Sequence, residues 1–546
     1  MGFWQWEGQC RARNMRDVGS VAVGIARWRA VFLAGFVTLF LLKLMLAATL
    51  SPFGDEAFYW QESRHLAWGY SDLPPLTAWL IRLGETVSGH GLLGMRWPFL
   101  LLGSVLPWLV RALAREQFDE ETGWQAGALC LVLPLAGSLG VMAVPDVPLT
   151  VAITVAVWAL LRAMQRDRLR DWCWLGLALG VCWLAHYRAA MPMLAGLLLL
   201  SITPRGRQQW RRPGLWLAMG VAALGLVPLV VSNGKQGGAG VAFQVIERHP
   251  WRFHADALVQ PVEQAIACTP LLYAWLLWAA WRCWKRRHEG APWDVVGVVS
   301  VSFIVLYFAL GLFADDLRFR AHWPLPGYLP LLALLPVLLR EHVPCRRGWI
   351  AAALGLALAG QLGGLVYLGL AATGEQGANL LAHLKAFPAR FVGWKESGAA
   401  ARELLAQRPA VLVADNFMMA AEVDFQLGGR VPIYALDSPL NAKHGRAPQL
   451  AAWQRDETAL RRAHGGAPML LVVDEKALRV HERADWLRTL CKRIAEPEPL
   501  LRLDIYGGRR RMAFYAGRVP SRVPINAAVD DRCPLWQFAR KADSAN

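Results

Sequence analysis

Two adjacent carboxylates, Asp55 and Glu56, directly follow Gly54 at the end of a long apolar run. The chain continues with interleaved aromatic and polar residues, SPFGDEAFYWQESRHLAWGY over residues 51–70 and SDLPPLTAW over 71–79. This pattern predicts a helix that lies in the membrane interface, and the alternative is a core helix of an outer loop. A carboxylate at the end of an apolar helix, facing outward, can take the proton from an acceptor hydroxyl as a general base. Alternatively, Asp55 caps a helix that starts at about Glu56, and one side chain can do both.

Two further acids stand at predicted turns. Asp72 precedes Leu-Pro-Pro at 73–75, and the prolines favour an extended turn that would return the chain toward Asp55. Asp72 is then either a second substrate ligand or a residue that caps the turn. Asp146 lies between two prolines, where it either caps the next helix or faces the same side as Asp55.

Basic side chains gather at two other turns, where a cation could bind a phosphate group. The alternatives are that the first turn anchors the chain at the membrane interface by snorkelling and that the second is a solvated loop. Two arginines in an outer loop oppose the usual charge bias of membrane proteins, which favours an anionic partner. The residues are His186, Tyr187 and Arg188 in the first turn, and Arg318, Arg320 and His322 in the second.

The composition is that of a membrane protein. Of its 546 residues 55% are hydrophobic, 27 are Trp and the mean hydropathy is +0.29, and several apolar runs reach the roughly 20 residues that cross a bilayer. The 58 Lys and Arg against 41 Asp and Glu concentrate in short loops, as in cytoplasmic loops, rather than in a nucleic-acid surface. Cys491 and Cys533 could form a disulfide in an oxidising compartment.

These runs predict a polytopic α-helical membrane protein with about eleven spans after a cytoplasmic tail at 1–27. Four arginine-rich loops fall on the side of the N-terminus, which places the first outer loop, 51–90, on the periplasmic side of the bacterial inner membrane. Lys43, within the first span, either snorkels or pairs inside the bundle. The predicted spans are 28–50, 91–112, 123–143, 147–162, 171–186, 188–203, 213–232, 264–281, 294–313, 323–340 and 349–372.

The composition changes at about residue 375, where charged residues become frequent and apolar runs shrink to the length of strands. Short apolar runs at 410–414 and 469–473, and a third segment at 511–515, predict strands with helices beside them. We therefore predict a catalytic transmembrane domain over 28–374 and a small soluble α/β domain over 375–546, on the periplasmic side.

The segment GDEAFYWQESRHLAWGYSDLPPLTAWLIRLG, with VPDVPL, HYRAAMPML and RAHWPLPGYLPLL after it, resembles bacterial members of the protein O-mannosyltransferase superfamily. These are glycosyltransferases of the GT-C fold, and the lipid A aminoarabinose transferase is a relative. The resemblance covers roughly residues 28–340. It implies transfer of a sugar, with inversion, from a polyprenyl-phosphate carrier of the undecaprenyl-phosphate type to a cell-envelope acceptor such as lipid A, another glycolipid or a protein.

The resemblance also implies roles for individual residues. Asp55 would be the catalytic base and Glu56 its neighbour in the motif, with Asp72 the second acid of the first outer loop and Asp146 the acid of the P-D-x-P turn. The basic turns would contact the substrate and stabilise the phosphate that leaves. Enzymes of this type generally require no metal, so no cofactor is expected, although Asp55 with Asp72 could hold a divalent cation.

The chain departs from the family pattern at three positions. His186 stands where many relatives have another basic residue, and Phe58 and Leu73 replace an Arg and a Lys of the aminoarabinose enzymes. The resemblance therefore leaves the sugar open.

Two other classes of function fit the many predicted spans. A transporter or lipid flippase usually has ionisable groups at mid-membrane depth and paired broken helices, whereas the acids here lie at the ends of spans. A scaffold whose C-terminal domain binds partners is the third reading.

Overall fold

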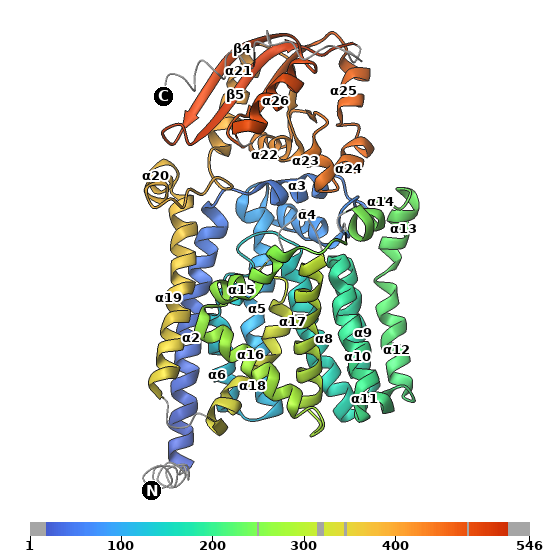
Figure 1. Ribbon diagram of the computed structural model, residues 1–546, viewed down its shortest axis with the longest axis vertical. Helices are drawn as coiled ribbons and strands as arrows, with labels where there is room; N and C mark the ends of the chain where they lie inside the picture. The colour runs from blue at the N-terminus through green and yellow to red at the C-terminus, as the bar shows by residue number, and fades with distance from the viewer. Residues whose placement is uncertain are drawn as a thin grey trace.

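The computed structural model describes residues 18–247, 251–313, 321–342, 347–477, 480–521 and 535. A bundle of helices forms one part of the molecule and a sheet with flanking helices lies at one end of it (Figure 1). The first described residue, Val18 at the start of α2, lies at the opposite end of the bundle, as does the arginine-containing helix α11 (Pro204–Gln209). This arrangement agrees with the predicted side of the arginine-rich loops.

Each predicted span contains a helix. Three of the predicted spans are divided into two helices, and the second helix has a proline in its first turn: α7 after α6, α13 after α12 and α16 after α15. Proline suits the first turn of a helix but not its interior. The helices are α2 (Val18–Thr49), α5 (Leu92–Gln117), α6 (Glu120–Val132), α7 (Pro134–Gly137), α8 (Asp146–Arg166), α9 (Leu169–Ala185), α10 (Ala190–Ile202), α12 (Pro213–Leu224), α13 (Val227–Lys235), α15 (Gln260–Cys268), α16 (Pro270–Lys285), α17 (Trp293–Phe313), α18 (Leu325–His342) and α19 (Arg347–Ala372).

Within the described ranges, six helical stretches are long and apolar enough to cross a membrane. Others are shorter: α6 has 13 residues, about 20 Å of helix against a hydrocarbon core of about 30 Å. The multi-pass character is thus confirmed, and the number of eleven spans stays a prediction. The six stretches are 22–49, 92–117, 146–166, 213–235, 293–313 and 348–372.

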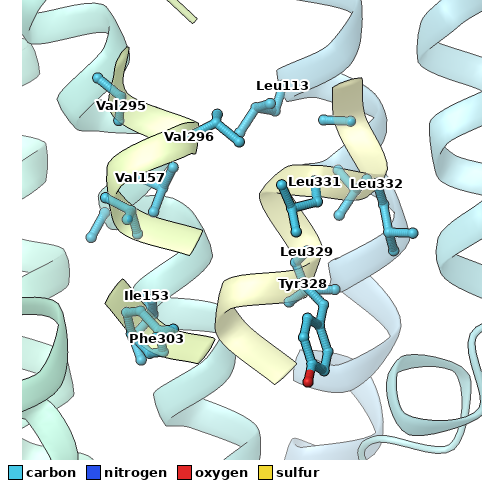
Figure 2. Close-up of a cluster of buried hydrophobic side chains, with 14 of the residues drawn as sticks. Leu113, Ile153, Val157, Val295, Val296, Phe303, Tyr328, Leu329, Leu331 and Leu332 are labelled. Carbon is cyan, nitrogen blue, oxygen red and sulfur yellow. The ribbon is translucent and has the colours of Figure 1, made fainter. Parts of the chain in front are cut away.

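The core of the bundle lies between α5, α8, α17 and α18. Leu113, Ile153, Val157, Phe303 and Leu331 are buried there, and Figure 2 shows them directed toward one another. Branched and aromatic side chains fill this space from four helices, which fixes the ends of α8 and α18 relative to each other.

Lys43 is buried within α2 rather than snorkelling. Its Nζ donates to the Ser104 hydroxyl of α5 at 3.4 Å. Of the two alternatives that the sequence leaves open, the structure shows pairing inside the bundle.

The C-terminal part contains a five-stranded sheet in the order β2-β1-β3-β5-β4. The strands β1 (Val411–Ala414), β2 (Ile433–Ala435) and β3 (Pro468–Asp474) are parallel, whereas β4 (Ala495–Ile505) and β5 (Arg510–Arg518) form an antiparallel pair at one edge. The helices are α20 (Glu375–His383), α21 (Trp394–Gln407), α22 (Phe417–Leu427), α23 (Pro439–Lys443), α24 (Ala447–Ala452), α25 (Glu457–His464) and α26 (Val480–Cys491).

The three strands predicted in this domain are present as β1, β3 and β5. The edge strand β4 escaped prediction because Pro497 and Pro499 interrupt its pattern, and it pairs with β5 through two register shifts. Prolines are tolerated in strands mainly at such edges. Cys491 is disulfide-bonded, and Cys533, its predicted partner, lies outside the described residues.

The first outer loop forms two helices, α3 (Gly54–Arg64) and α4 (Leu76–Ser88), between the bundle and the sheet domain (Figure 1). The aromatic residues of α3 pack against α22: the rings of Phe58 and Phe417 are 5.4 Å apart, and those of Trp60 and Phe425 are 5.2 Å apart. The prediction that α3 lies in the membrane interface is therefore wrong. Its aromatic face is buried beneath the C-terminal domain, as the core of an outer loop.

Candidate active site

Asp55 lies in the first turn of α3 and is partly open to solvent. The residue at the helix N-cap is Phe53, without a capping side chain, so Asp55 does not cap the helix. Its side chain is 23% exposed and faces two residues of the C-terminal domain. Asp55 Oδ1 is 3.5 Å from Arg446 Nη2 and 3.7 Å from His444 Nδ1.

Arg446 joins three carboxyl groups of the first outer loop, Asp55, Glu62 and Asp72, which we call the acid cluster. Arg446 Nη1 is 2.5 Å from Asp72 Oδ2 and 3.3 Å from Glu62 Oε1. The guanidinium also lies 4.3 Å from the centre of the Phe58 ring, a cation–π contact. Glu62, Asp72 and Arg446 are all buried, so Asp55 is the accessible member of the cluster.

Burial favours the uncharged form of both buried acids, Glu62 and Asp72. Burial, together with the charge of Asp72 and a hydrogen bond to it, raises the pKa of Glu62 well above its usual value. Burial also raises the pKa of Asp72, although Arg446 opposes that rise. Burial disfavours the charge of Arg446, but its acidic neighbours outweigh this and raise the pKa of the guanidinium. Of the two buried acids, Glu62 is therefore the one whose neutral form its surroundings favour more strongly.

The turn that carries Arg446 connects α23 and α24 and inserts between two outer segments. Ser71 Oγ donates to the Gly445 carbonyl at 2.6 Å, and Gln449 Oε1 accepts from the Ser71 N–H at 3.0 Å. Gly445 has φ +69°, and a Cβ there would lie 2.7 Å from the ring of Phe243. Only glycine fits this turn without strain.

A second group of predicted residues meets at the adjoining end of the bundle. Arg188 Nη2 lies 2.5 Å from Asp146 Oδ1, and His322 Nε2 lies 3.2 Å from the same oxygen. The Arg188 guanidinium stacks 5.0 Å from the centre of the Trp323 ring. His186 turns its ring inward, with Nδ1 accepting from the Arg188 N–H at 2.9 Å. We call Asp146, Arg188 and His322 the Arg188 cluster.

The interpretation of Asp146 as a helix cap is wrong. Pro145 occupies the N-cap of α8 and no side chain caps that end. The Asp146 carboxylate instead binds Arg188, because the turn at 186–188 places the guanidinium next to it.

Tyr187 precedes Arg188 in the chain and lies within electrostatic range of Asp72. Its hydroxyl accepts from Asn233 Nδ2 at 3.1 Å, and burial, with a smaller effect from the charge of Asp72, raises the pKa of the hydroxyl. Gln244, from the outer segment after α13, donates to the Asp72 carbonyl at 2.7 Å. The acid cluster and the Arg188 cluster therefore border one region at the outer end of the bundle.

Glu56 is placed differently from the prediction. Its side chain is fully buried and forms a bidentate ion pair with Arg96 of α5. Arg96 Nε donates to Oε1 at 2.7 Å, and Nη2 donates to Oε2 at 2.6 Å. The Ala143 N–H also donates to Oε1 at 2.7 Å. With both oxygens engaged, Glu56 joins α3 to the bundle and is not placed to contact a substrate. Arg318 and Arg320 lie outside the described residues.

Comparisons with known proteins agree with this arrangement. The family model of the dolichyl-phosphate-mannose-protein mannosyltransferases matches residues 72–231. The lipid A galacturonosyltransferase RgtD of Rhizobium johnstonii is 26% identical over 419 residues, which cover 74% of this chain and 82% of RgtD.

Two crystal structures of ArnT from Cupriavidus metallidurans share the fold. The apo form has a TM-score of 0.63 and 18% identity, and the match covers 90% of this chain and 98% of ArnT. The form bound to undecaprenyl phosphate has a TM-score of 0.63 and 16% identity over 89% and 98% of the two chains. The chain shares the GT-C fold of these structures. Its match to RgtD supports a relation to the lipid A transferases.

Three residues of this site, Glu62, Arg446 and His444, are absent from the sequence-based prediction. Glu62 follows Asp55 by seven residues, which is two helical turns, so the shared face was readable from the spacing. Arg446 is 391 residues from Asp55, and no local pattern marked it. His444 enters the GT-C site with Arg446, on the same turn.

In this GT-C chain, Arg446 contacts both Asp55 and Asp72, the two acids that were predicted to be able to hold a divalent cation. In the described part of the chain, no group of three or more His, Cys, Asp or Glu side chains is arranged to bind a metal. That the reaction requires no cofactor stays a prediction.

Proposed function

We propose that the chain transfers a sugar from a polyprenyl-phosphate carrier of the undecaprenyl-phosphate type to a lipid A-type acceptor, with inversion at the anomeric carbon. The observation that carries this proposal is the accessible carboxylate of Asp55, set in a buried cluster beside the Arg188 cluster. One cluster supplies a base, and the other supplies a cation for a phosphate.

In the proposed reaction the acceptor hydroxyl attacks the anomeric carbon while Asp55 takes its proton. The new glycosidic bond forms as the bond from that carbon to the phosphate oxygen breaks, and the phosphate leaves with the electron pair. Arg188 is suited to stabilise the leaving group because its Nε is buried and has no hydrogen-bond partner among the residues that the structure describes. Such a donor, directed at charge that develops in the transition state, accelerates the reaction.

The relatives support the lipid-linked substrates. RgtD is described as a lipid A galacturonosyltransferase, and one ArnT structure holds undecaprenyl phosphate. The outer segment next to Asp72 also exposes large apolar side chains, which suits lipid substrates at the membrane surface. These residues include Val245, Ile246, Trp251, Phe253 and Val262.

The proposed orientation places both clusters and the C-terminal domain in the periplasm. The arginine-rich turns lie at the other end of the bundle, in line with the positive-inside rule. The disulfide-bonded Cys491 supports an oxidising compartment for the C-terminal domain.

The proposal is tested by reconstitution of the purified protein in liposomes with lipid A and a set of undecaprenyl-phosphate-linked sugars, read by mass spectrometry of the lipids. We expect one sugar to appear on lipid A with stoichiometric release of undecaprenyl phosphate. Movement of the donor between leaflets without any glycosidic product would contradict the proposal and favour a flippase.

Arg188→Gln is expected to weaken use of the donor. The substitution removes the cation but leaves a side chain that can donate to Asp146, so we expect a fall in kcat/KM of roughly 10- to 100-fold, in keeping with a lost charge-assisted hydrogen bond. Steady-state kinetics with varied donor measure this. Arg212→Gln, at an exposed ion pair with Asp167, is the matched control and should retain the kcat/KM of the wild type.

A further inference from the structure

We propose that Arg446 of the C-terminal domain is a positioning residue for sugar transfer, which orients Asp55 and balances the charge of the two buried acids beside it. This inference rests on the proposed function. In this proposal the C-terminal domain contributes a residue, Arg446, to the active site.

The geometry around Arg446 shows how it acts on Asp55. Nη1 binds Asp72 and Glu62, and Nη2 lies 3.5 Å from Asp55 Oδ1. The guanidinium is rigid and planar, so its strong contact with Asp72 fixes the direction in which Nη2 points. In the described part of the chain, Oδ1 is the oxygen of Asp55 that faces His444 and Arg446, which leaves Oδ2 for an acceptor hydroxyl.

The surroundings hold Arg446 in one position. The Phe58 and Tyr59 rings lie 4.3 Å and 5.1 Å from its guanidinium carbon. The Phe417 ring, from α22, lies 5.6 Å from it. The side chain is buried between the domains, and a side chain confined in this way orients its partners with little loss of entropy on catalysis.

The charge balance explains why a cation is needed there. Three carboxyl groups, Asp55, Glu62 and Asp72, face one another around a single guanidinium. Like charges disfavour ionisation of their neighbours, and an opposite charge favours it. Without Arg446 the cluster would hold its protons to higher pH, and a protonated base cannot accept the proton of the acceptor. Among the described residues, the other titratable groups that face the cluster are Tyr59 from α3, Tyr70 from the loop before Asp72, Tyr187 from the turn before α10, and His444.

The alternative is that Arg446 only holds the two domains together. Both roles predict loss of stability when it is removed, so stability alone does not distinguish them. A positioning role also predicts a change in the pH dependence of kcat, which a purely structural contact would leave unchanged.

The test compares full-length Arg446→Gln and Arg446→Lys with the wild type, using pH–rate profiles and steady-state kinetics with the sugar donor found for the wild type. For Arg446→Gln we expect kcat to fall by about 10²-fold or more, with little change in the donor KM, and the acidic limb of the profile to move about 1–3 pH units upward. Arg446→Lys keeps the charge, so its acidic limb should stay at the wild-type pH while kcat falls less.

Asp424→Asn is the matched control. It alters the hydrogen bond of 2.8 Å between Gln61 and Asp424, another contact between the domains, and touches no member of the acid cluster. We expect its acidic limb to coincide with that of the wild type. If Asp424→Asn moves the limb as far as Arg446→Gln does, the effect is structural and the inference is overturned.

The double variant Arg446→Gln/Asp72→Asn keeps the test decisive if Arg446→Gln fails to fold, because it removes one acid together with the cation. We expect its acidic limb near that of the wild type and its kcat at least tenfold lower, since Asp55 has lost its orienting partner. Wild-type kcat in either folded variant overturns the inference. Failure of the proposed function looks different, because the wild type itself would then transfer no sugar.

Discussion

Asp55→Asn is expected to abolish measurable sugar transfer, with kcat reduced by roughly 10²- to 10⁴-fold, the usual contribution of a general base. The amide has nearly the same shape as the carboxylate but cannot accept the proton of the acceptor hydroxyl. Binding of the lipid donor should persist, because its phosphate is proposed to bind at the Arg188 cluster. Single-turnover assays together with a donor-binding titration separate the two effects.

The matched control for Asp55 is Asp256→Asn, an isosteric change at an exposed residue of the outer segment 255–259. It should leave both turnover and donor binding unchanged. Turnover at the wild-type rate in Asp55→Asn would remove Asp55 from the chemistry and, with it, the mechanism proposed above.

Arg96→Met is expected to cause the largest loss of stability. The substitution removes the cation that pairs with the fully buried Glu56. Removing one partner of a buried ion pair typically lowers the free energy of unfolding by about 3–5 kcal/mol. Glu56 would have to be buried as an unpaired charge or take up a proton. We expect a large fall in the midpoint of thermal unfolding in detergent, measured by the fraction of protein that stays monodisperse.

The double variant Glu56→Gln/Arg96→Met tests the cause of that loss. Because the charge left behind is removed, it should recover part of the stability. Arg115→Met, at an exposed pair with Glu120, is the control and should change stability by less than about 1 kcal/mol. Equal destabilisation of the single and double variants would show that packing, not the buried charge, decides the effect.

Together these variants test different roles for two neighbouring residues: catalysis for Asp55 and stability for Glu56. Asp55 and Glu56 are adjacent in the chain, yet successive residues of a helix point about 100° apart. One carboxylate therefore faces the C-terminal domain and solvent, and the other faces α5. Asp55 is therefore the residue proposed for proton transfer, and Glu56 holds α3 against the helix bundle.

Much of the candidate site could be predicted from local patterns. Asp72 and Asp146 were expected at turns on the side of Asp55, and the structure places them in the acid cluster and the Arg188 cluster. The turn at 186–188 was expected as a basic turn, and it does supply Arg188. Such predictions succeed because prolines and the ends of apolar runs act over a few residues.

Other features had no local signal. The interface position predicted for α3 failed because the aromatic pattern of a lipid-facing helix and that of a helix buried under a domain are the same. The structural role of Glu56 depends on Arg96, which is 40 residues away, and periodicity carries no information about partners at that distance.

By itself, the sequence determined that this is a multi-pass membrane protein with an α/β domain after about residue 375, because hydropathy and periodicity are properties of contiguous segments. Only the tertiary structure decided that Asp55 stays accessible to solvent and that Arg446 is the cation in contact with it. Arg446 reaches Asp55 across 391 residues because the α23–α24 turn packs onto the first outer loop, and such long-range pairing depends on complementary surfaces rather than on local order.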